Sequence, residues 1–308
     1  MELVSIILTT LNSERYLERS IRSCLDQSHG RLELLVVDGG SSDGTLEIVH
    51  SQRDGRVRLI QQPANEGKLP GAINLGLAAA RGDFITWSQD DSWFEPDAIE
   101  SMLGFLRERP EVALVYTDYW EVDAAGRPLR LRRVNPPEHI LVDDVIRQCF
   151  LMRRGVYEAV GPQETAYFPV HEVPWRIQVA KQFTICPWRR PLLHYTVHPD
   201  SLTGRIGNLA LRRMTARLLH QLSYFDARGY RRRLAEIDVL EAYEALEGAG
   251  GRGRFVKYAL RGLIQDPGFL RNRGLLKLLA ASLLPIPGLK PVAAAGVGGS
   301  KGDEGGRP

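Results

Sequence analysis

Cysteine is scarce in this chain of 308 residues, and long apolar runs are absent. The three cysteines, Cys24, Cys149 and Cys186, are widely spaced and form no C-x-x-C pair, which excludes a disulfide framework and a structural zinc site. This usage is typical of a reducing compartment, and we expect a cytoplasmic protein. The longest uncharged apolar run near the C-terminus, LLAASLLPIPGL, contains two prolines and is shorter than the roughly 20 residues of a membrane span.

A large charge imbalance is also missing. The 40 Lys and Arg against 37 Asp and Glu leave a net charge of +3, too small over this length to predict a nucleic acid partner. The N-terminal run LVSIILTTL has no basic segment before it and no small-residue cleavage site after it, so it predicts a buried strand rather than a signal peptide. The remaining composition, 44% hydrophobic and 25% charged, is that of an ordinary globular protein.

The first third of the chain alternates between apolar runs and amphipathic segments. The apolar runs LVSIILTT, LELLVVD, VRLIQQ and DFITWS predict strands, and the segments between them predict helices near residues 13–27, 45–52 and 69–80. Continuous apolar strands that alternate with helices are typical of a parallel sheet buried on both faces. The sequence therefore predicts an α/β domain.

The pattern changes twice farther along the chain. A predicted helix at 96–107 is followed by VALVYTDYWEVD and LRLRRV, which we interpret as a β-hairpin around a turn at 125–128. The later segments are helical and rich in arginine, and the glycine-rich end predicts disorder. We expect a catalytic domain at 1–203, a helical extension at 204–285 and a disordered tail at 286–308.

Polar residues follow each of the four predicted strands. In order along the chain they include Thr9 and Asn12, Asp38, Lys68, and the pair Asp90 and Asp91. Ligands of open α/β sheets bind at the carboxyl edge of the strands, so we expect these side chains to share one site.

The adjacent carboxylates Asp90 and Asp91 require an explanation. Two like charges at the end of a buried strand are unfavourable unless a cation or several donors neutralise them. The residues alone leave two interpretations open, a divalent metal site or a solvated acidic turn.

Six segments, taken in order, resemble the family 2 glycosyltransferases with the GT-A fold over roughly residues 3–203. They are VSIILTTLN, VVDGGSSDGT, NEGKLPGAINLGLAAARGDFITWSQDD, CFLMRRGVYEAVG, HEVPWRIQVAK and LLHYTVHPDSL. The resemblance implies a Rossmann-like, mostly parallel sheet flanked by helices, with a C-terminal helical extension. It also implies an inverting transfer of a sugar from a nucleotide-diphosphate donor to a carbohydrate or lipid-linked acceptor, in the synthesis of a polysaccharide or glycoconjugate.

The resemblance also assigns a donor site. It implies nucleotide contacts from Thr9, Leu11, Asn12, Asp38, Lys68 and Asp90. Asp91 and His198 would ligate Mn²⁺ or Mg²⁺ on the diphosphate, and we expect weak metal affinity without substrate. Leu11 stands where many relatives have an aromatic residue, and Ser88 replaces the first acid of the D-x-D-D pattern.

The acceptor side follows from HEVPW. Glu172 takes the position of the family's catalytic base and His171 that of the preceding acid, although a first-turn acid also stabilises a helix. Trp93 and Trp175 are candidates for stacking on sugars, with His171 as a further acceptor contact.

Two alternatives to transfer stay open. An inactive nucleotide-sugar binding protein is compatible with the changed acids, and a sugar nucleotidyltransferase would share the architecture but release pyrophosphate. Between residues 205 and 277 the chain has fifteen Lys and Arg against seven Asp and Glu. This excess predicts either peripheral contact with the inner face of a membrane or a helical bundle with a solvated basic face.

Overall fold

The computed structural model describes residues 2–62, 65–141, 145–146, 149–247 and 251–283. The chain divides into two compact units, Met1–Leu211 and Arg212–Pro308, so the first unit ends eight residues beyond the predicted boundary at residue 203. The predicted tail at 286–308 lies outside the described residues.

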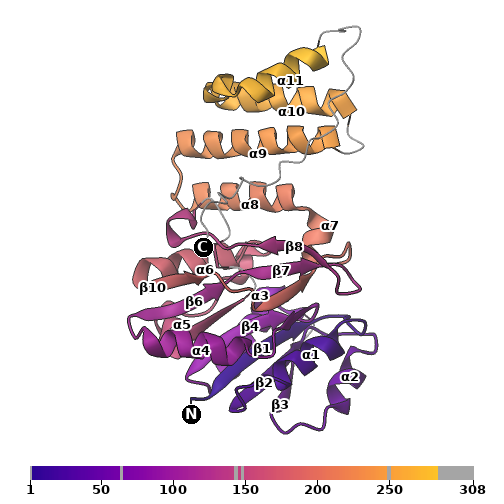
Figure 1. The fold of residues 1–308 in the computed structure, drawn as a ribbon, viewed down its shortest axis with the longest axis vertical. Coiled ribbons are helices and arrows are strands. Elements are labelled where there is room, and N and C mark those ends of the chain that lie inside the picture. The colour runs from indigo at the N-terminus through magenta and orange to yellow at the C-terminus, as the bar shows by residue number, and fades with distance from the viewer. Residues whose placement is uncertain (1, 63–64, 142–144, 147–148, 248–250, 284–308) are drawn as a thin grey trace, which may run out of the picture. The chain divides into compact units, whose positions relative to one another are not determined.

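A seven-stranded sheet forms the centre of the first unit (Figure 1). Its order is β10-β6-β9-β4-β1-β2-β3. All neighbouring strands are parallel except β9, which is antiparallel to both β4 and β6. The strands are β1 (Val4–Thr10), β2 (Leu32–Asp38), β3 (Val57–Gln61), β4 (Phe84–Gln89), β6 (Val112–Thr117), β9 (Phe150–Arg153) and β10 (Thr184–Trp188).

Helices cover both faces of this sheet because its strands are apolar on both sides. Neighbouring residues of β1 point to opposite faces, so Ile6 belongs to one buried cluster and Ile7 to the other. The Ile6 cluster includes side chains of α1 (Leu17–Leu25), α2 (Thr45–Ser51) and α4 (Ala98–Glu108). The Ile7 cluster includes side chains of α3 (Lys68–Ala79), α5 (Arg154–Val160) and α6 (Glu172–Gln182).

A second sheet of four strands has the order β5-β11-β7-β8. Its strands are β5 (Ser92–Phe94), β11 (Leu193–Thr196), β7 (Tyr119–Val122) and β8 (Pro128–Arg132). The predicted hairpin is therefore confirmed only for β7 and β8, because VALVYTDYWEVD is divided between two sheets. The division lies at buried Asp118, whose Oδ1 accepts a hydrogen bond of 2.8 Å from the Val134 amide.

The C-terminal segments are helical, as the sequence predicted. They form α7 (Leu202–Ile206), α8 (Asn208–Gln221), α9 (Ala227–Glu247), α10 (Gly251–Gln265) and α11 (Arg273–Leu283). Short 3₁₀ helices occupy Pro137–His139, Thr165–Tyr167 and Pro267–Arg271. Phe255, Ala259 and Leu275 centre an apolar core between α9, α10 and α11. In the described part of the chain, no helix combines the length and hydrophobicity needed to cross a membrane.

Candidate functional site

Parallel register brings the predicted strand ends into one row. Thr10 at the end of β1 lies opposite Asp38 at the end of β2, and Asp38 lies opposite Gln61 at the end of β3. On the other side of β1, Thr9 pairs with Gln89, the last residue of β4. The segment that contains the two acids therefore begins at the same sheet edge as the turns that follow β1 and β2.

The two adjacent acids meet different partners. The Asp90 carboxylate accepts a hydrogen bond of 3.2 Å from the Leu11 amide, and its carbonyl oxygen accepts one of 2.6 Å from the Ser20 hydroxyl. Burial and the neighbouring charge of Asp91 raise the pKa of Asp90 to about 7. This end of β4 thus holds more negative charge than its surroundings stabilise.

Asp91 is joined to a residue far away in sequence. Its side chain is buried, Oδ1 accepts a hydrogen bond of 3.0 Å from the Ser92 hydroxyl, and Oδ2 lies 3.2 Å from Nε2 of His198. The antiparallel pairing of β5 with β11 creates this contact across 107 residues of sequence. The His198 ring also packs against Tyr16 of the loop before α1, with centroids 4.8 Å apart.

A divalent metal fits this pair of side chains. The Asp91 carboxylate and the His198 imidazole converge next to the Asp90 carboxyl, whose pKa is raised. A divalent cation bound here would offset the negative charge of the two acids. Among the described residues, no group of three or more His, Cys, Asp and Glu side chains is arranged to hold a metal. The chain therefore offers two ligands, and substrate phosphates and water would have to complete the shell.

The turn after β2 uses its predicted binding residue internally. The Asp38 carboxylate is fully buried and accepts hydrogen bonds from the amides of Gly40, at 3.0 Å, and Ser41, at 3.1 Å, and from the Ser41 hydroxyl. Asn12 Oδ1 accepts a hydrogen bond of 2.8 Å from the Ser42 amide, which ties this turn to β1. A nucleotide base could reach Asp38 only by displacing the donors of the turn.

The other predicted nucleotide contacts are arranged around this turn and α3. Thr9 is buried within β1, whereas the Leu11 side chain is 45% exposed. Lys68 is exposed at the start of α3, and its Nζ lies 4.9 Å from the centroid of the Phe168 ring. The structure thus brings Leu11 to the acid pair and directs Lys68 toward a different segment.

The segment before α6 buries a histidine. His171 stacks on Phe168 with ring centroids 6.0 Å apart, and neither ring nitrogen has a hydrogen-bond partner among the described residues. Burial lowers the pKa of His171, so the ring is neutral at pH 7.

Glu172 begins α6, as the first-turn position predicted. Its Oε2 forms an ion pair with Arg176, one helical turn later, and the guanidinium side chain is only 7% exposed. The Glu172 side chain is 21% exposed, and this ion pair occupies one of its carboxylate oxygens.

The two predicted tryptophan platforms are already in contact with protein groups. Trp175 is 4% exposed, packs edge to face on Trp87, and donates a hydrogen bond of 3.0 Å from Nε1 to the Gly161 carbonyl. This burial leaves no exposed face of Trp175 for stacking on a sugar. Trp93 stacks on His194 with centroids 4.8 Å apart, and the guanidinium of Arg19 also covers its ring.

Arg19 is a site residue that the sequence analysis missed. Its Nη2 donates a hydrogen bond of 3.3 Å to the Thr196 hydroxyl, which in turn donates to the Asp91 carbonyl. Burial lowers the pKa of Arg19, and the negative charge of Asp91 opposes that shift. No signal in the sequence distinguished it from Arg15 and Arg22, because Trp93 and Thr196, which hold it, are far away along the chain.

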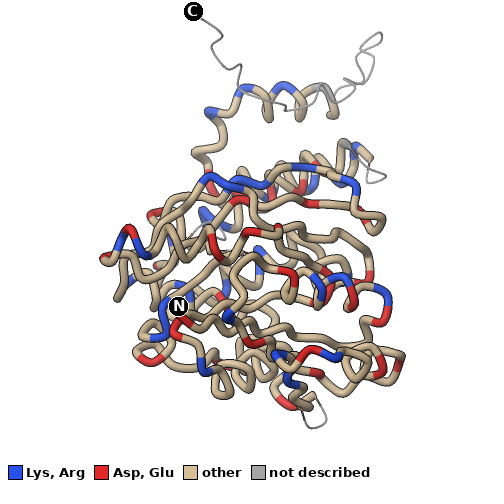
Figure 2. The backbone as a smooth tube through the Cα atoms, turned by 60° about the horizontal axis from the view of Figure 1, so that its bottom comes forward, with Lys and Arg blue, Asp and Glu red and all other residues tan. Residues whose placement is uncertain are grey.

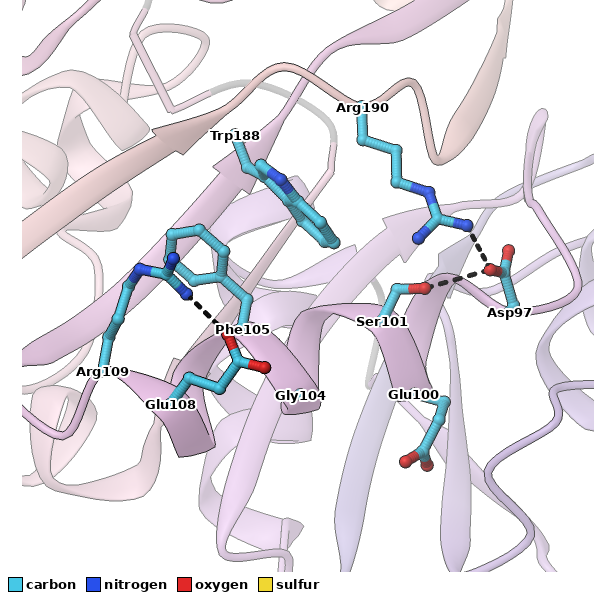
Figure 3. A pocket seen from close by; sticks show the side chains of 9 residues that line it. All are labelled: Asp97, Glu100, Ser101, Gly104, Phe105, Glu108, Arg109, Trp188 and Arg190. Atoms are coloured by element: carbon cyan, nitrogen blue, oxygen red, sulfur yellow. Dashed lines mark hydrogen bonds and ion pairs between the residues drawn. The ribbon is translucent and has the colours of Figure 1, made fainter.

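A hollow of about 350 Å³ lies elsewhere, along α4. Figure 3 shows Phe105 and Trp188 on one side of it and the Arg190–Asp97 ion pair on the other. No predicted site residue lines this hollow. The Asp91 site is defined instead by converging polar groups at the sheet edge.

Comparison with known proteins identifies the family of the chain. Residues 5–161 match the family model for glycosyl transferase family 2, and the chain belongs to this family. An uncharacterized glycosyltransferase of Haemophilus influenzae is 36% identical over 133 residues, which cover 42% of this chain and 52% of that protein. EpsH of Bacillus subtilis is 27% identical over 299 residues, which cover 86% of this chain and 84% of EpsH. The chain thus spans about half the length of the first relative.

Solved structures of low sequence identity share the fold. The structure of S. aureus TarS 1-349 in complex with UDP has a TM-score of 0.57 and 18% identity, covering 91% of this chain and 87% of that one. The mannosyltransferase PcManGT of Pyrobaculum calidifontis, in complex with GDP-Man and Mn²⁺, has a TM-score of 0.53 and 16% identity, covering 92% of this chain and 74% of that one. The predicted GT-A fold is confirmed.

Proposed function

We propose that this chain is an inverting glycosyltransferase that depends on Mn²⁺ or Mg²⁺. It moves one sugar from a nucleotide-diphosphate donor to a hydroxyl of a carbohydrate or lipid-linked acceptor, as part of polysaccharide or glycoconjugate synthesis. The observation that carries the proposal is the contact between Asp91 and His198 at the sheet edge where β1, β2 and β4 end. This contact lies next to the Asp90 carboxyl, whose pKa is raised. The nucleotide ligands named for the solved TarS and PcManGT structures support the donor class.

The reaction requires a pair of metal ligands and a general base from this chain. Asp91 and His198 would hold the metal, which would supply Lewis-acid stabilisation to the diphosphate. Glu172 takes the proton of the acceptor hydroxyl, whose oxygen attacks the anomeric carbon from the face opposite the diphosphate. The bond between that carbon and the diphosphate oxygen breaks, its electron pair leaves with the nucleoside diphosphate, and the configuration inverts.

The test is a turnover assay with a panel of nucleotide-diphosphate sugars, Mn²⁺ and carbohydrate acceptors. We expect nucleoside diphosphate release and a product with inverted anomeric configuration by NMR. Asp91→Asn should lower kcat at least a hundredfold, by analogy with the loss of one group that stabilises developing charge. Asp83→Asn, at the exposed opposite end of β4, serves as the matched control and should keep full activity. Release of pyrophosphate would identify a nucleotidyltransferase instead.

The ion pair of Glu172 favours a second candidate, a nucleotide-sugar binding protein without turnover. A carboxylate held by buried Arg176 is less free to receive a proton than a solvated one. Glu172→Gln separates the two functions, because an active enzyme should lose about a hundredfold to ten-thousandfold in kcat while nucleotide affinity stays the same. Unchanged turnover in this variant would remove Glu172 from the mechanism.

The C-terminal helices support peripheral contact with an anionic membrane, which would suit a lipid-linked acceptor. Residues 251–283 contain seven Lys and Arg against one acidic residue. Figure 2 colours Lys and Arg blue and Asp and Glu red along the backbone. On α10, Ile264 is 80% exposed and Leu260 is 41% exposed. Both lie on the side of the helix opposite buried Phe255, and Lys257 lies on that same side. Exposed apolar residues beside a basic one are typical of a helix that contacts a membrane surface.

Vesicle flotation tests this contact. The chain should float with vesicles that contain phosphatidylglycerol and remain free with phosphatidylcholine alone. Ile264→Glu should reduce the floated fraction, whereas Leu129→Glu, at a similarly exposed aliphatic side chain of β8, should not. Equal flotation of the two variants would contradict a role for α10.

A further inference from the structure

Arg19 carries a positive charge without an acidic partner in its own site. It is half-buried on α1, and among the described residues it forms no ion pair within 4.0 Å and makes one hydrogen bond, to Thr196. Arg22, three residues later on the same helix, is 69% exposed and pairs with Glu18. A partly desolvated guanidinium with unused donors is unfavourable unless an anion completes its contacts.

Three elements hold this guanidinium in place. Its carbon lies 3.5 Å from the centroid of the Trp93 ring on β5, an attractive arrangement of a cation over an aromatic face. Nη2 is bound to Thr196 on β11. A Cβ atom built on Gly126, in the turn between β7 and β8, would lie 3.3 Å from Nη1, so the turn also confines the group. A guanidinium fixed in this way loses little conformational freedom when it binds a ligand.

The hydrogen bonds lead from Arg19 to the backbone of Asp91, the proposed metal ligand. Thr196 receives a hydrogen bond from Arg19 and donates one to the Asp91 carbonyl, so only one hydroxyl lies between the guanidinium and the Asp91 backbone. The Asp91 carboxylate is in turn 3.2 Å from His198. The cation therefore lies one hydroxyl away from the backbone of the residue that would hold the metal of the donor diphosphate.

We propose that Arg19 binds the diphosphate of the donor and of the departing nucleoside diphosphate, with Trp93 positioning the guanidinium. The proposal rests on the proposed glycosyltransferase function. Arginine suits this role because its planar donors match two phosphate oxygens at once. A fixed positive charge near the oxygen that receives the electron pair favours departure of the leaving group. Trp93 then acts through Arg19 instead of stacking on a sugar.

The experiment compares nucleoside diphosphate and nucleoside monophosphate binding by calorimetry in the presence of Mn²⁺. The wild-type chain is first tested against UDP and GDP, and the preferred base is then used for Arg19→Gln, Arg19→Lys and Arg22→Gln. Arg19→Gln should weaken the diphosphate about tenfold to hundredfold, the usual loss for a hydrogen bond to a charged group. It should weaken the monophosphate less than the diphosphate, and Arg19→Lys should recover part of the loss. Arg22→Gln, on the solvent side of α1, should bind both as the wild type does.

Each other outcome has a defined meaning. If the wild-type chain binds no nucleoside diphosphate, the proposed function fails, and the assignment of Arg19 fails with it. If the wild type binds and Arg19→Gln retains its affinity for the diphosphate, only the assignment of Arg19 is overturned. Equal weakening of both nucleotides in Arg19→Gln and Arg19→Lys, together with a lower Tm, would show a purely structural role. A higher acceptor KM with unchanged nucleotide affinity would assign Arg19 to the acceptor and overturn the proposal.

Discussion

Removing the charge of Asp90 should stabilise the metal-free protein. The ordinary pKa of this carboxyl is 3.8, and in the folded chain burial and the charge of Asp91 raise it to about 7. Because the folded pKa lies above the unfolded one, the stability contribution of this group is complete below pH 3.8 and is lost as pH rises through 7. Asp90→Asn removes the ionisation and keeps an oxygen for the Leu11 amide.

The size of the effect follows from the pKa difference. A change of one pKa unit corresponds to about 1.36 kcal/mol, so the variant should gain at most about 4 kcal/mol at pH 8. For a unit of about 200 residues, each kcal/mol shifts Tm by roughly 2–4 °C, which sets an upper limit of about 16 °C. At pH 5 the folded carboxyl is largely protonated, and the gain should fall to less than half.

Calorimetry of the two proteins in EDTA at pH 5 and pH 8 measures this difference. Addition of Mn²⁺ with a nucleoside diphosphate should then raise the Tm of the wild type and reduce the advantage of the variant. An Asp90→Asn protein that melts at or below the wild-type temperature at pH 8 without metal would refute the view that β4 ends in excess negative charge.

Four further substitutions probe the scaffold. Glu33→Gln should cost about 1–3 kcal/mol at pH 7 and less in acid, measured by calorimetry. Burial acts to raise the pKa of Glu33, but its hydrogen bonds and its ion pair outweigh burial and lower the pKa below 4.5. The stabilisation from Glu33 is therefore lost as the pH falls. Gly76→Ala should cost about 1–3 kcal/mol of stability and so lower the Tm, because the new Cβ would lie 2.3 Å from the Ile7 side chain of β1. Gly104→Ala, with open space around its Cβ, should raise the Tm slightly. Asp238→Ala should cost about 1–3 kcal/mol in urea unfolding, because Arg213, Arg261 and Gln265 lose a fully buried partner while Arg213 keeps its ion pair with Glu241.

The local pattern of the sequence was sufficient to predict β1, β2, β3 and β4 and the sheet edge at which they end. Continuous apolar runs predicted the strands, because a parallel strand covered by helices on both faces needs apolar residues on both sides. The polar residues that follow these runs lie at one edge of the sheet, because the carboxyl ends of parallel strands all lie at the same edge. The acid pair was recognisable because two adjacent carboxylates at the end of a buried strand need a counter-charge.

Only the tertiary structure decided which side chains are available. Trp175 and Trp93 looked alike as aromatic residues near the site, yet one is buried against Trp87 and the other is covered by Arg19. The antiparallel placement of β9 and the division of the chain at Asp118 were equally hidden. Sequence periodicity reports which faces are apolar, but it does not report which distant segment will cover them.

The same distinction applies to charge. The sequence alone determined that a carboxylate follows β4 and that an acid opens α6, because both positions follow from local pattern and from family motifs. The tertiary structure decided that Glu172 is paired with Arg176 and that an arginine from α1 is linked through Thr196 to the backbone of Asp91. Hydrogen bonds and ion pairs act over a few ångströms, so their partners are fixed only when strands and helices distant in sequence pack together.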